Sequence, residues 1–156
     1  MPVDTFSIRM VQEKDARALW QLANDPVTRE NSLLSARISW EDHLRWFYEA
    51  LRMKDRLTMY VACLGPCVVG QLRFFEDSPG SSTVSIGLAQ GYRGKGLGKK
   101  LLSGRLGFYL SRNPQVDRLR AVIKRTNTPS TRLFTGQGFK IAATSNETLI
   151  LMFDRR

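Results

Sequence analysis

Apolar residues in the first part of the chain follow two spacings, one typical of strands and one typical of helices. Residues 5–11 alternate as a strand does, and residues 13–23 then carry apolar side chains at helical spacing. Pro26 ends that helix, and residues 27–38 show no clean period, which predicts a loop or a short irregular helix. The chain is therefore expected to begin with a strand, a helix and an irregular connection.

The middle of the chain predicts a helix followed by three strands. Ser39 fits the N-cap of a capping box, and the apolar residues after it predict a helix from about Trp40 to Arg52. Two apolar runs then flank a tight Gly-Pro turn, which predicts an antiparallel hairpin, and another strand follows the next turn signal. These three strands are expected over residues 57–63, 67–75 and 81–88.

The longest helix is expected after Gly94, where apolar residues recur at helical spacing to about Ser111. Thr128 and Pro129 then resemble the N-cap and first residue of a helix that ends near Gly136. No linker, repeat or low-complexity segment divides this order, so we expect one α/β domain over residues 1–156 with a mixed sheet. Its last strands are predicted over residues 118–124, 139–143 and 148–153.

The charge of the chain restricts its partners. With 24 Lys and Arg against 14 Asp and Glu, the net charge of +10 favours polyanions such as nucleic acid, phosphate-rich cofactors or nucleotide-linked substrates. Nucleic acid is the weakest of the three, because no long basic tract and no nucleic-acid-binding signature occurs. No signal-peptide pattern or membrane-length apolar run is found, so we expect a soluble, cytoplasmic protein without a membrane partner.

Metal binding is not expected from this sequence. Cys63 and Cys67 are the only cysteines, and no second pair or histidine cluster completes a zinc site around them.

The clearest chemical feature is a glycine-rich segment between an apolar strand and the long helix. Glycines at alternate positions let the backbone approach a ligand, and the helix N-terminus offers free N–H groups with partial positive charge. The segment therefore predicts an anion site, suited to a pyrophosphate, or else a glycine turn that only caps a basic helix. Its glycines are Gly94, Gly96 and Gly98, and its basic residues are Arg93, Lys95, Lys99 and Lys100.

Two other glycine-loop motifs do not fit the same segment. A P-loop needs Gly-x4-Gly-Lys-Ser/Thr, but Arg93 stands at the first glycine and Lys100 at the hydroxyl residue. The dinucleotide fingerprint Gly-x-Gly-x-x-Gly fails because Gly98 comes one position too early.

The segment resembles the Arg/Gln-x-x-Gly-x-Gly/Ala signature of the GNAT acyltransferases, here Arg93-x-x-Gly96-x-Gly98. Residues 127–130 resemble the family's Asn-x-x-Ser, residues 133–139 resemble its Leu-Tyr-x-x-x-Gly-Phe, and the order of elements fits throughout. The resemblance implies an α/β (α+β) fold with a mixed, mostly antiparallel seven-stranded sheet and about four helices. It also implies a sheet splayed between its fourth and fifth strands, with acetyl-CoA as co-substrate and no metal.

By the same resemblance, backbone groups on the fourth strand pair with the pantetheine arm, and the amides of the glycine-rich segment hold the pyrophosphate. Asn127 and Ser130 then contact the far side of the cofactor, unless Asn127 only caps the following helix. The cofactor-binding residues expected are Ile86, Gly87, Leu88, Arg93, Gly94, Lys95, Gly96, Leu97, Gly98, Lys99, Asn127, Ser130 and Phe134.

Acyl transfer to an amine needs an oxyanion donor, an acid and a base. The resemblance suggests a backbone N–H near Gly87 or Leu88 for the thioester carbonyl. It suggests no acid, because Phe134 replaces the tyrosine that commonly donates the proton. Another group, water or direct release of the thiolate must therefore serve.

The base is not assigned by the sequence, which offers three candidates. His43 titrates near neutrality, but it is equally suited to the polar face of a helix. Glu76 stands at a strand end and either faces the acceptor or is merely solvated. Ser85 occupies the strand position where some relatives carry a catalytic glutamate.

The acceptor is suggested by residues 24–46, which look like the amino-sugar acetyltransferases of bacterial surface-glycan routes, including the pseudaminic acid pathway. They resemble the branch that acetylates protein N-termini more loosely. Arginines here could meet the diphosphate of a nucleotide sugar while a tryptophan stacks on a ring, or they could solvate a helix whose tryptophans fill the core. The candidates for acceptor binding are Arg29, Trp40, Arg45 and Trp46.

Three classes of function stay open at this point. The first is an N-acetyltransferase for a nucleotide-linked amino sugar, and the second is one for a protein N-terminus or another small amine. The third is a non-catalytic acyl-CoA-binding or interaction module, which the absence of the proton-donating tyrosine favours. Exposed edge strands also leave a homodimer open.

Overall fold

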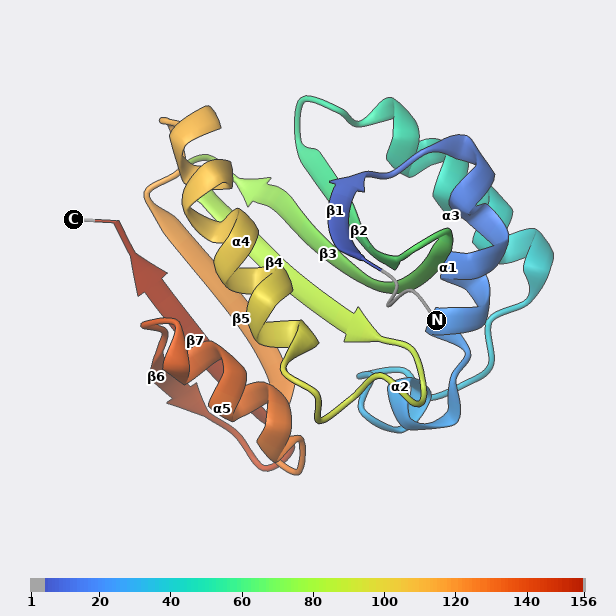
Figure 1. Ribbon diagram of the computed structural model, residues 1–156. Helices are drawn as coiled ribbons and strands as arrows, with labels where there is room; N and C mark the ends of the chain where they lie inside the picture. Colours follow the sequence, from blue (N-terminus) through green and yellow to red (C-terminus); the bar gives the residue numbers. More distant parts are fainter. Residues whose placement is uncertain (1–4, 156) are drawn as a thin grey trace.

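The computed structural model describes residues 5–155 and is built around one seven-stranded sheet (Figure 1). The strand order is β1-β2-β3-β4-β5-β7-β6, and every neighbouring pair is antiparallel except β4 and β5. This is the mixed, mostly antiparallel sheet that the sequence predicts. Its strands are β1 Phe6–Met10, β2 Leu57–Leu64, β3 Cys67–Ser78, β4 Ser81–Leu88, β5 Arg118–Lys124, β6 Lys140–Thr144 and β7 Thr148–Asp154.

Helices cover both faces of this sheet. They are α1 Ala16–Ala23, α2 Pro26–Glu30, α3 Trp40–Arg52, α4 Leu97–Arg112 and α5 Thr128–Gly136, with a short 3₁₀ turn, η1 Glu13–Asp15, before α1. Successive side chains of a strand point to opposite faces, and β2 shows this directly. Tyr60 and Ala62 join the core under α4 and α5, whereas Met59 and Val61 join a second core under α1 and α3.

Two helix starts differ from the sequence prediction. The first helix begins at Ala16 and not at Glu13, because the buried carboxylate of Asp15 accepts from the Gln12 N–H (2.7 Å) and fixes a 3₁₀ turn there. The last helix is capped by Asn127, one residue before the predicted Thr128. The Asn127 Oδ1 accepts from the Ser130 N–H at 3.3 Å, which satisfies one of the free donors of that helix.

The irregular connection between α1 and α3 contains one short helix, α2. Asp25 caps it by accepting from the Thr28 N–H at 3.1 Å, and Pro26 occupies its first position. The prediction of a loop or short irregular helix is confirmed for this segment.

The sheet splays between β4 and β5. Only three residue pairs join these parallel strands, Ser81–Thr83 with Arg118–Arg120. Beyond Thr83, β4 continues to Leu88 and β5 continues to Lys124 without pairing to each other. The splay that the family resemblance implies is therefore present, and it opens toward the C-terminal ends of both strands.

Over residues 5–155, none of the helices has both the length and the apolar character needed to cross a membrane.

Candidate active site

The glycine-rich segment that follows β4 has a backbone that L-residues rarely adopt. Gly91, Gly94 and Gly96 have φ values of 89°, 75° and 80°, all in the left-handed region. A Cβ added at any of the three would meet no atom within 4 Å, so conformation and not space requires glycine there. We call residues 90–98 the glycine loop.

The glycine loop leads directly into the N-terminus of α4. Gly96 is the N-cap residue, no side chain caps the helix within the described chain, and its first turn contains no acidic residue. The first N–H groups of α4 therefore point out of the helix with partial positive charge. This geometry suits an anion, and it gathers the predicted residues Arg93–Lys99 at one place.

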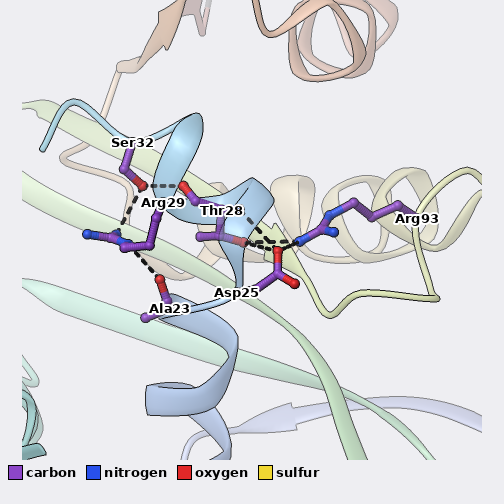
Figure 2. Close-up of polar contacts among 6 residues, drawn as sticks. All are labelled: Ala23, Asp25, Thr28, Arg29, Ser32 and Arg93. Atoms are coloured by element: carbon purple, nitrogen blue, oxygen red, sulfur yellow. Dashed lines mark hydrogen bonds and ion pairs between the residues drawn. The ribbon is translucent and has the colours of Figure 1, made fainter. Parts of the chain in front are cut away.

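The side chain of Arg93 reaches toward Asp25 and Thr28 in the connection between α1 and α3, as Figure 2 shows. Its guanidinium forms an ion pair with Asp25 and donates to the Thr28 Oγ1 at 3.1 Å. Burial alone would raise the pKa of Asp25, but the hydrogen bonds from Arg93 and Thr28 outweigh burial and lower it. Arg93 therefore fixes the glycine loop to α2 and leaves the anion to the backbone amides.

The inner edge of the splay is formed by alternate residues of β4. The Ala89 N–H donates to the Val69 carbonyl at 2.8 Å, and the register pairs Gly87 with Gln71. Because hydrogen-bonded and free positions alternate along an antiparallel edge, Gly87 directs its backbone groups toward β3, whereas Ile86 and Leu88 direct theirs into the splay. Of the two expected oxyanion donors, the register therefore favours Leu88 over Gly87.

A cavity of about 320 Å³ adjoins β4 on the face covered by α3, where the splay begins. It combines apolar walls with two arginines and two carboxylates, a composition typical of small-molecule sites. We call it the acceptor cavity. Its lining consists of Trp46, Glu49, Ala50, Met53, Leu57, Arg73, Phe75, Asp77, Thr83, Ser85 and Arg120.

Ser85 and Arg73 face each other across the floor of the acceptor cavity. They are register partners on β4 and β3, and the Arg73 Nη2 lies 3.4 Å from the Ser85 Oγ. The Arg73 guanidinium also lies 5.0 Å from the centre of the Trp46 ring. Ser85 is thus placed in the cavity as expected, but its hydroxyl accepts from a cation and is not arranged as a base.

A second hollow, of about 410 Å³, runs along α1 toward the glycine loop. Arg37 lines it, with its guanidinium 5.6 Å from the ring of Trp20, and Gln90 lines it at the start of the loop.

His43 is a core residue and not a base in the acceptor cavity. It is 4% exposed, and its ring stacks against those of Trp40 and Phe47. Its Nε2 lies 2.8 Å from the Ala16 carbonyl, so this nitrogen carries the proton and donates. Burial lowers its pKa. Neither the base role nor the alternative of a polar helix face describes this position, because α3 packs His43 against α1.

Glu76 holds a turn and does not face the acceptor cavity. Its carboxylate accepts from the Gly80 N–H (3.2 Å) and from the Gln115 Nε2 (3.0 Å). Phe75 and Asp77, its neighbours on β3, line the cavity, so alternation places Glu76 on the opposite face of the sheet.

The predicted arginines of the acceptor site lie elsewhere. Arg29 donates to the Ala23 carbonyl at 2.7 Å and to the Ser32 hydroxyl at 3.0 Å (Figure 2). It also donates to the carbonyls of Leu34 and Ala36, at 2.9 and 3.2 Å, and so organises the connection between α1 and α3. Arg45 is 71% exposed and pairs with Asp42 one turn away on α3. Neither lines the acceptor cavity.

The two tryptophans predicted to bind the acceptor lie in different surroundings. Trp40 packs edge-on against Trp20, with ring centres 5.3 Å apart, and joins the core under α1 and α3. Trp46 alone of the predicted acceptor residues lines the acceptor cavity.

Phe134 is buried in the core under α4 and α5, where its ring meets that of Phe139 edge-on at 5.0 Å. Its contact with the cofactor, like that of Asn127 and Ser130, stays a prediction.

Four residues that line the acceptor cavity were not predicted from the sequence, namely Arg73, Glu49, Asp77 and Arg120. A signal for Arg73 was present, because it is a charged residue inside an apolar strand. The sequence contains no such signal for Glu49 and Asp77, since acidic residues on a helix or near a turn are ordinarily solvated.

Comparisons with known proteins agree with this geometry. The family model described as an acetyltransferase (GNAT) domain matches residues 6–140. No curated protein matches the chain. Among solved structures, a ribosomal-protein-alanine N-acetyltransferase from Brucella melitensis is 25% identical with a TM-score of 0.77, over 95% of this chain and 99% of that one.

Two further structures share the fold at lower identity. An aminoglycoside acetyltransferase in complex with coenzyme A is 20% identical, with a TM-score of 0.79 over 97% of this chain and 95% of that one. A spermidine N-acetyltransferase from Vibrio cholerae, in complex with coenzyme A and spermine, is 15% identical, with a TM-score of 0.82 over 96% of this chain and 95% of that one.

The chain belongs to the GNAT acetyltransferase family. Its class is that of the acetyl-CoA-dependent N-acetyltransferases, with acetyl-CoA as the co-substrate. Within residues 5–155, no group of three or more metal-ligating side chains is arranged to hold an ion.

Proposed function

We propose that the protein transfers acetyl from acetyl-CoA to the primary amine of a small molecule that enters the acceptor cavity. The observation that carries this proposal is the position of that cavity, which reaches Thr83 and Ser85 at the point where β4 separates from β5. The splay and the acceptor cavity therefore meet at β4, so two substrates can approach each other there. The activity is proposed to be cytoplasmic.

Acetyl-CoA supplies the activated acetyl group as a thioester. The amides at the start of α4 are proposed to bind its diphosphate, and the free backbone groups of Ile86 and Leu88 to pair with its pantetheine arm. The Leu88 N–H is then suited to polarise the thioester carbonyl, because it points into the splay and needs no side chain.

The amine must lose a proton as its nitrogen attacks the carbonyl carbon, and the departing sulfur must gain one when the C–S bond breaks. Two carboxylates line the acceptor cavity. Asp77 is engaged by Arg120 (3.2 Å) and by the Thr83 hydroxyl (2.5 Å). Glu49 is exposed on α3 and has no such engagement within the described chain. We assign the base role, acting directly or through water, to Glu49.

For the acceptor we retain the class suggested by the sequence, a nucleotide-linked amino sugar. This class is supported by the resemblance of residues 24–46, by the ring of Trp46 in the cavity lining and by the guanidinium of Arg73 beside it. Arg29 and Arg45 no longer contribute, since their guanidinium groups are held elsewhere. Arg37, in the hollow beside the glycine loop, remains available to a phosphate.

The alternative acceptors are a protein N-terminus, in line with the Brucella melitensis structure, and cationic amines such as those named for the other two structures. A panel of amino-sugar nucleotides, N-terminal peptides, polyamines and aminoglycosides separates them, with release of free thiol from acetyl-CoA as the readout. Turnover with peptides alone would reject the small-molecule proposal. Failure to bind acetyl-CoA in calorimetry would reject acetyl transfer altogether and favour an interaction module.

A homodimer is a further proposal. The outer strand β6 is exposed along its whole length, and Ile141 on it is 53% exposed, so its free edge can pair with a second copy. Sedimentation of the purified protein tests this, and a monomer at all concentrations would reject it.

A further inference from the structure

Arg73 is a charged residue in the middle of an otherwise apolar strand. Its neighbours on β3, Leu72 and Phe74, are fully buried in the core under α4. Alternation along the strand then places Arg73 on the opposite face, where it lines the acceptor cavity. A cation in such a position is costly unless a negative charge compensates it.

No carboxylate of the described chain forms an ion pair with Arg73. Among residues 5–155, its Nε has no hydrogen-bond partner, and the polar contact of its guanidinium is the long one to Ser85. Asp77, the acidic residue nearest in sequence, is paired with Arg120. Burial lowers the pKa of Arg73 to about 10, with a smaller contribution from Arg29, so the group remains charged at neutral pH.

We propose that the acceptor amine carries an anionic group, a carboxylate or a phosphate, which Arg73 binds inside the acceptor cavity. This inference rests on the proposed acetyl transfer and adds the chemical class of the acceptor. A guanidinium offers a planar pair of N–H donors that matches both oxyanions. Trp46 covers one face of this guanidinium, and the Arg73 side chain lines the cavity that such a ligand would enter.

The acceptor cavity sets a size limit as well as a charge. At about 320 Å³ it lies at the small end of ligand sites, which span about 300–1,000 Å³. It suits an amino acid or a sugar phosphate, and a nucleotide would have to extend outside it. Polyamines and aminoglycosides carry only positive charge and would leave Arg73 uncompensated.

The test uses pairs of acceptors that differ only in the anionic group. Glucosamine 6-phosphate is compared with glucosamine, and phenylalanine with phenylalaninamide, by thiol release from acetyl-CoA. The pairs separate the two sources, since the first offers a phosphate and the second a carboxylate. We expect one anionic member to be preferred in kcat/KM by about tenfold or more, the effect of a hydrogen bond to a charged group.

Arg73→Met should abolish this preference by raising KM for the anionic acceptor, so that both members of the pair are turned over with similar kcat/KM. Arg73→Lys keeps the positive charge but lacks the planar pair of N–H donors, so it should retain part of the preference for the anionic acceptor. Arg45→Met, on the solvent face of α3, is the matched control and should retain all of it. A preference that survives Arg73→Met, or no preference in the wild type, would overturn the inference.

Binding of acetyl-CoA, measured by calorimetry in the wild type and in each variant, keeps the two proposals apart. A wild-type protein that does not bind acetyl-CoA would count against the proposed function. If acetyl-CoA binds but neither pair is turned over, the thermal midpoint is measured with each acceptor present. A rise with an anionic member that needs Arg73 supports the inference, and equal or absent shifts overturn it.

Discussion

Arg93 and Asp25 lie 68 positions apart in the sequence and form an ion pair that joins the glycine loop to the N-cap residue of α2. At the other end of α2, the Lys124 Nζ donates to the Glu30 carbonyl at 2.6 Å. Arg93 follows β4 and Lys124 ends β5, so this five-residue helix is attached to both sides of the splay. The spacing of the two strand ends therefore depends on a helix that pairs with neither of them.

Asp25→Asn should lower the free energy of unfolding by about 1 kcal/mol, because Arg93 keeps an oxygen acceptor but loses the charge that strengthens this hydrogen bond. Asparagine caps helices as well as aspartate does, so the substitution removes the charge and keeps the cap. Chemical denaturation at neutral pH measures the change. Asp42→Asn breaks an exposed pair on α3 and should have little effect, and an equal loss in both variants would contradict this account.

The same ion pair predicts a pH dependence of stability. Asp25 has a lowered pKa in the folded state, so its contribution is complete above its unfolded pKa of about 3.9 and is lost as the pH falls through the folded value. The difference in unfolding free energy between the wild type and Asp25→Asn should therefore shrink in acid. A difference that stays constant down to about pH 2 would show that the charge is not responsible.

Gly96→Ala should weaken acetyl-CoA binding and destabilise the fold by about 1–2 kcal/mol, because φ at this position is 80°. Gly107 is the matched control, since it lies exposed in the middle of α4 with open space around its Cβ position. Gly107→Ala should raise stability by up to about 1 kcal/mol and leave acetyl-CoA affinity unchanged. Calorimetric binding and thermal unfolding of both variants decide between a local requirement for glycine and a general effect on α4.

His43→Phe should reduce stability by about 1–3 kcal/mol, because it leaves the buried Ala16 carbonyl without its donor. The pKa of His43 is lowered, so the wild type should also lose stability as the pH falls below about 6.5, where the unfolded histidine takes up a proton and the folded one does not. The pH profile of kcat/KM should be the same in the folded His43→Phe variant as in the wild type. Disappearance of an acid limb from that profile would restore His43 as a base.

Glu49→Gln should lower kcat/KM by about a hundredfold or more, the usual loss of a general base, with acetyl-CoA affinity unchanged. Glu41→Gln changes an exposed glutamate in the first turn of the same helix and should leave the rate as it is. A fully active Glu49→Gln enzyme would return the base role to water or to the substrate itself.

Local patterns in the sequence predicted the elements well where the hydrophobic period was clear. The bounds of α3 and β5 agree with the prediction to the residue, since a serine cap fixes the first and a run of alternating apolar residues fixes the second. The first helix was predicted three residues too long, because the buried carboxylate of Asp15 accepts from the Gln12 N–H and from Arg9 and fixes a 3₁₀ turn there, and periodicity does not register such contacts.

The glycine loop could also be predicted, because one short segment contains both its glycines and its helix. The acceptor side could not. Arg73 and Ser85 become neighbours only through the register of two strands, and His43 is buried only because α3 packs on α1. A histidine or arginine in a polar-looking helix gives no sign of which face another helix will cover.

The three residue pairs between β4 and β5 make the sheet a structure in two parts, with four strands on one side and three on the other. A substrate arm that fills the splay would supply the hydrogen bonds that neither strand offers the other, as an eighth strand would. Amide hydrogen exchange along the second half of β4 should then slow when acetyl-CoA binds. Bound acetyl-CoA would therefore stabilise the sheet across the splay, and the release of coenzyme A after the reaction would make the two parts of the sheet more mobile again.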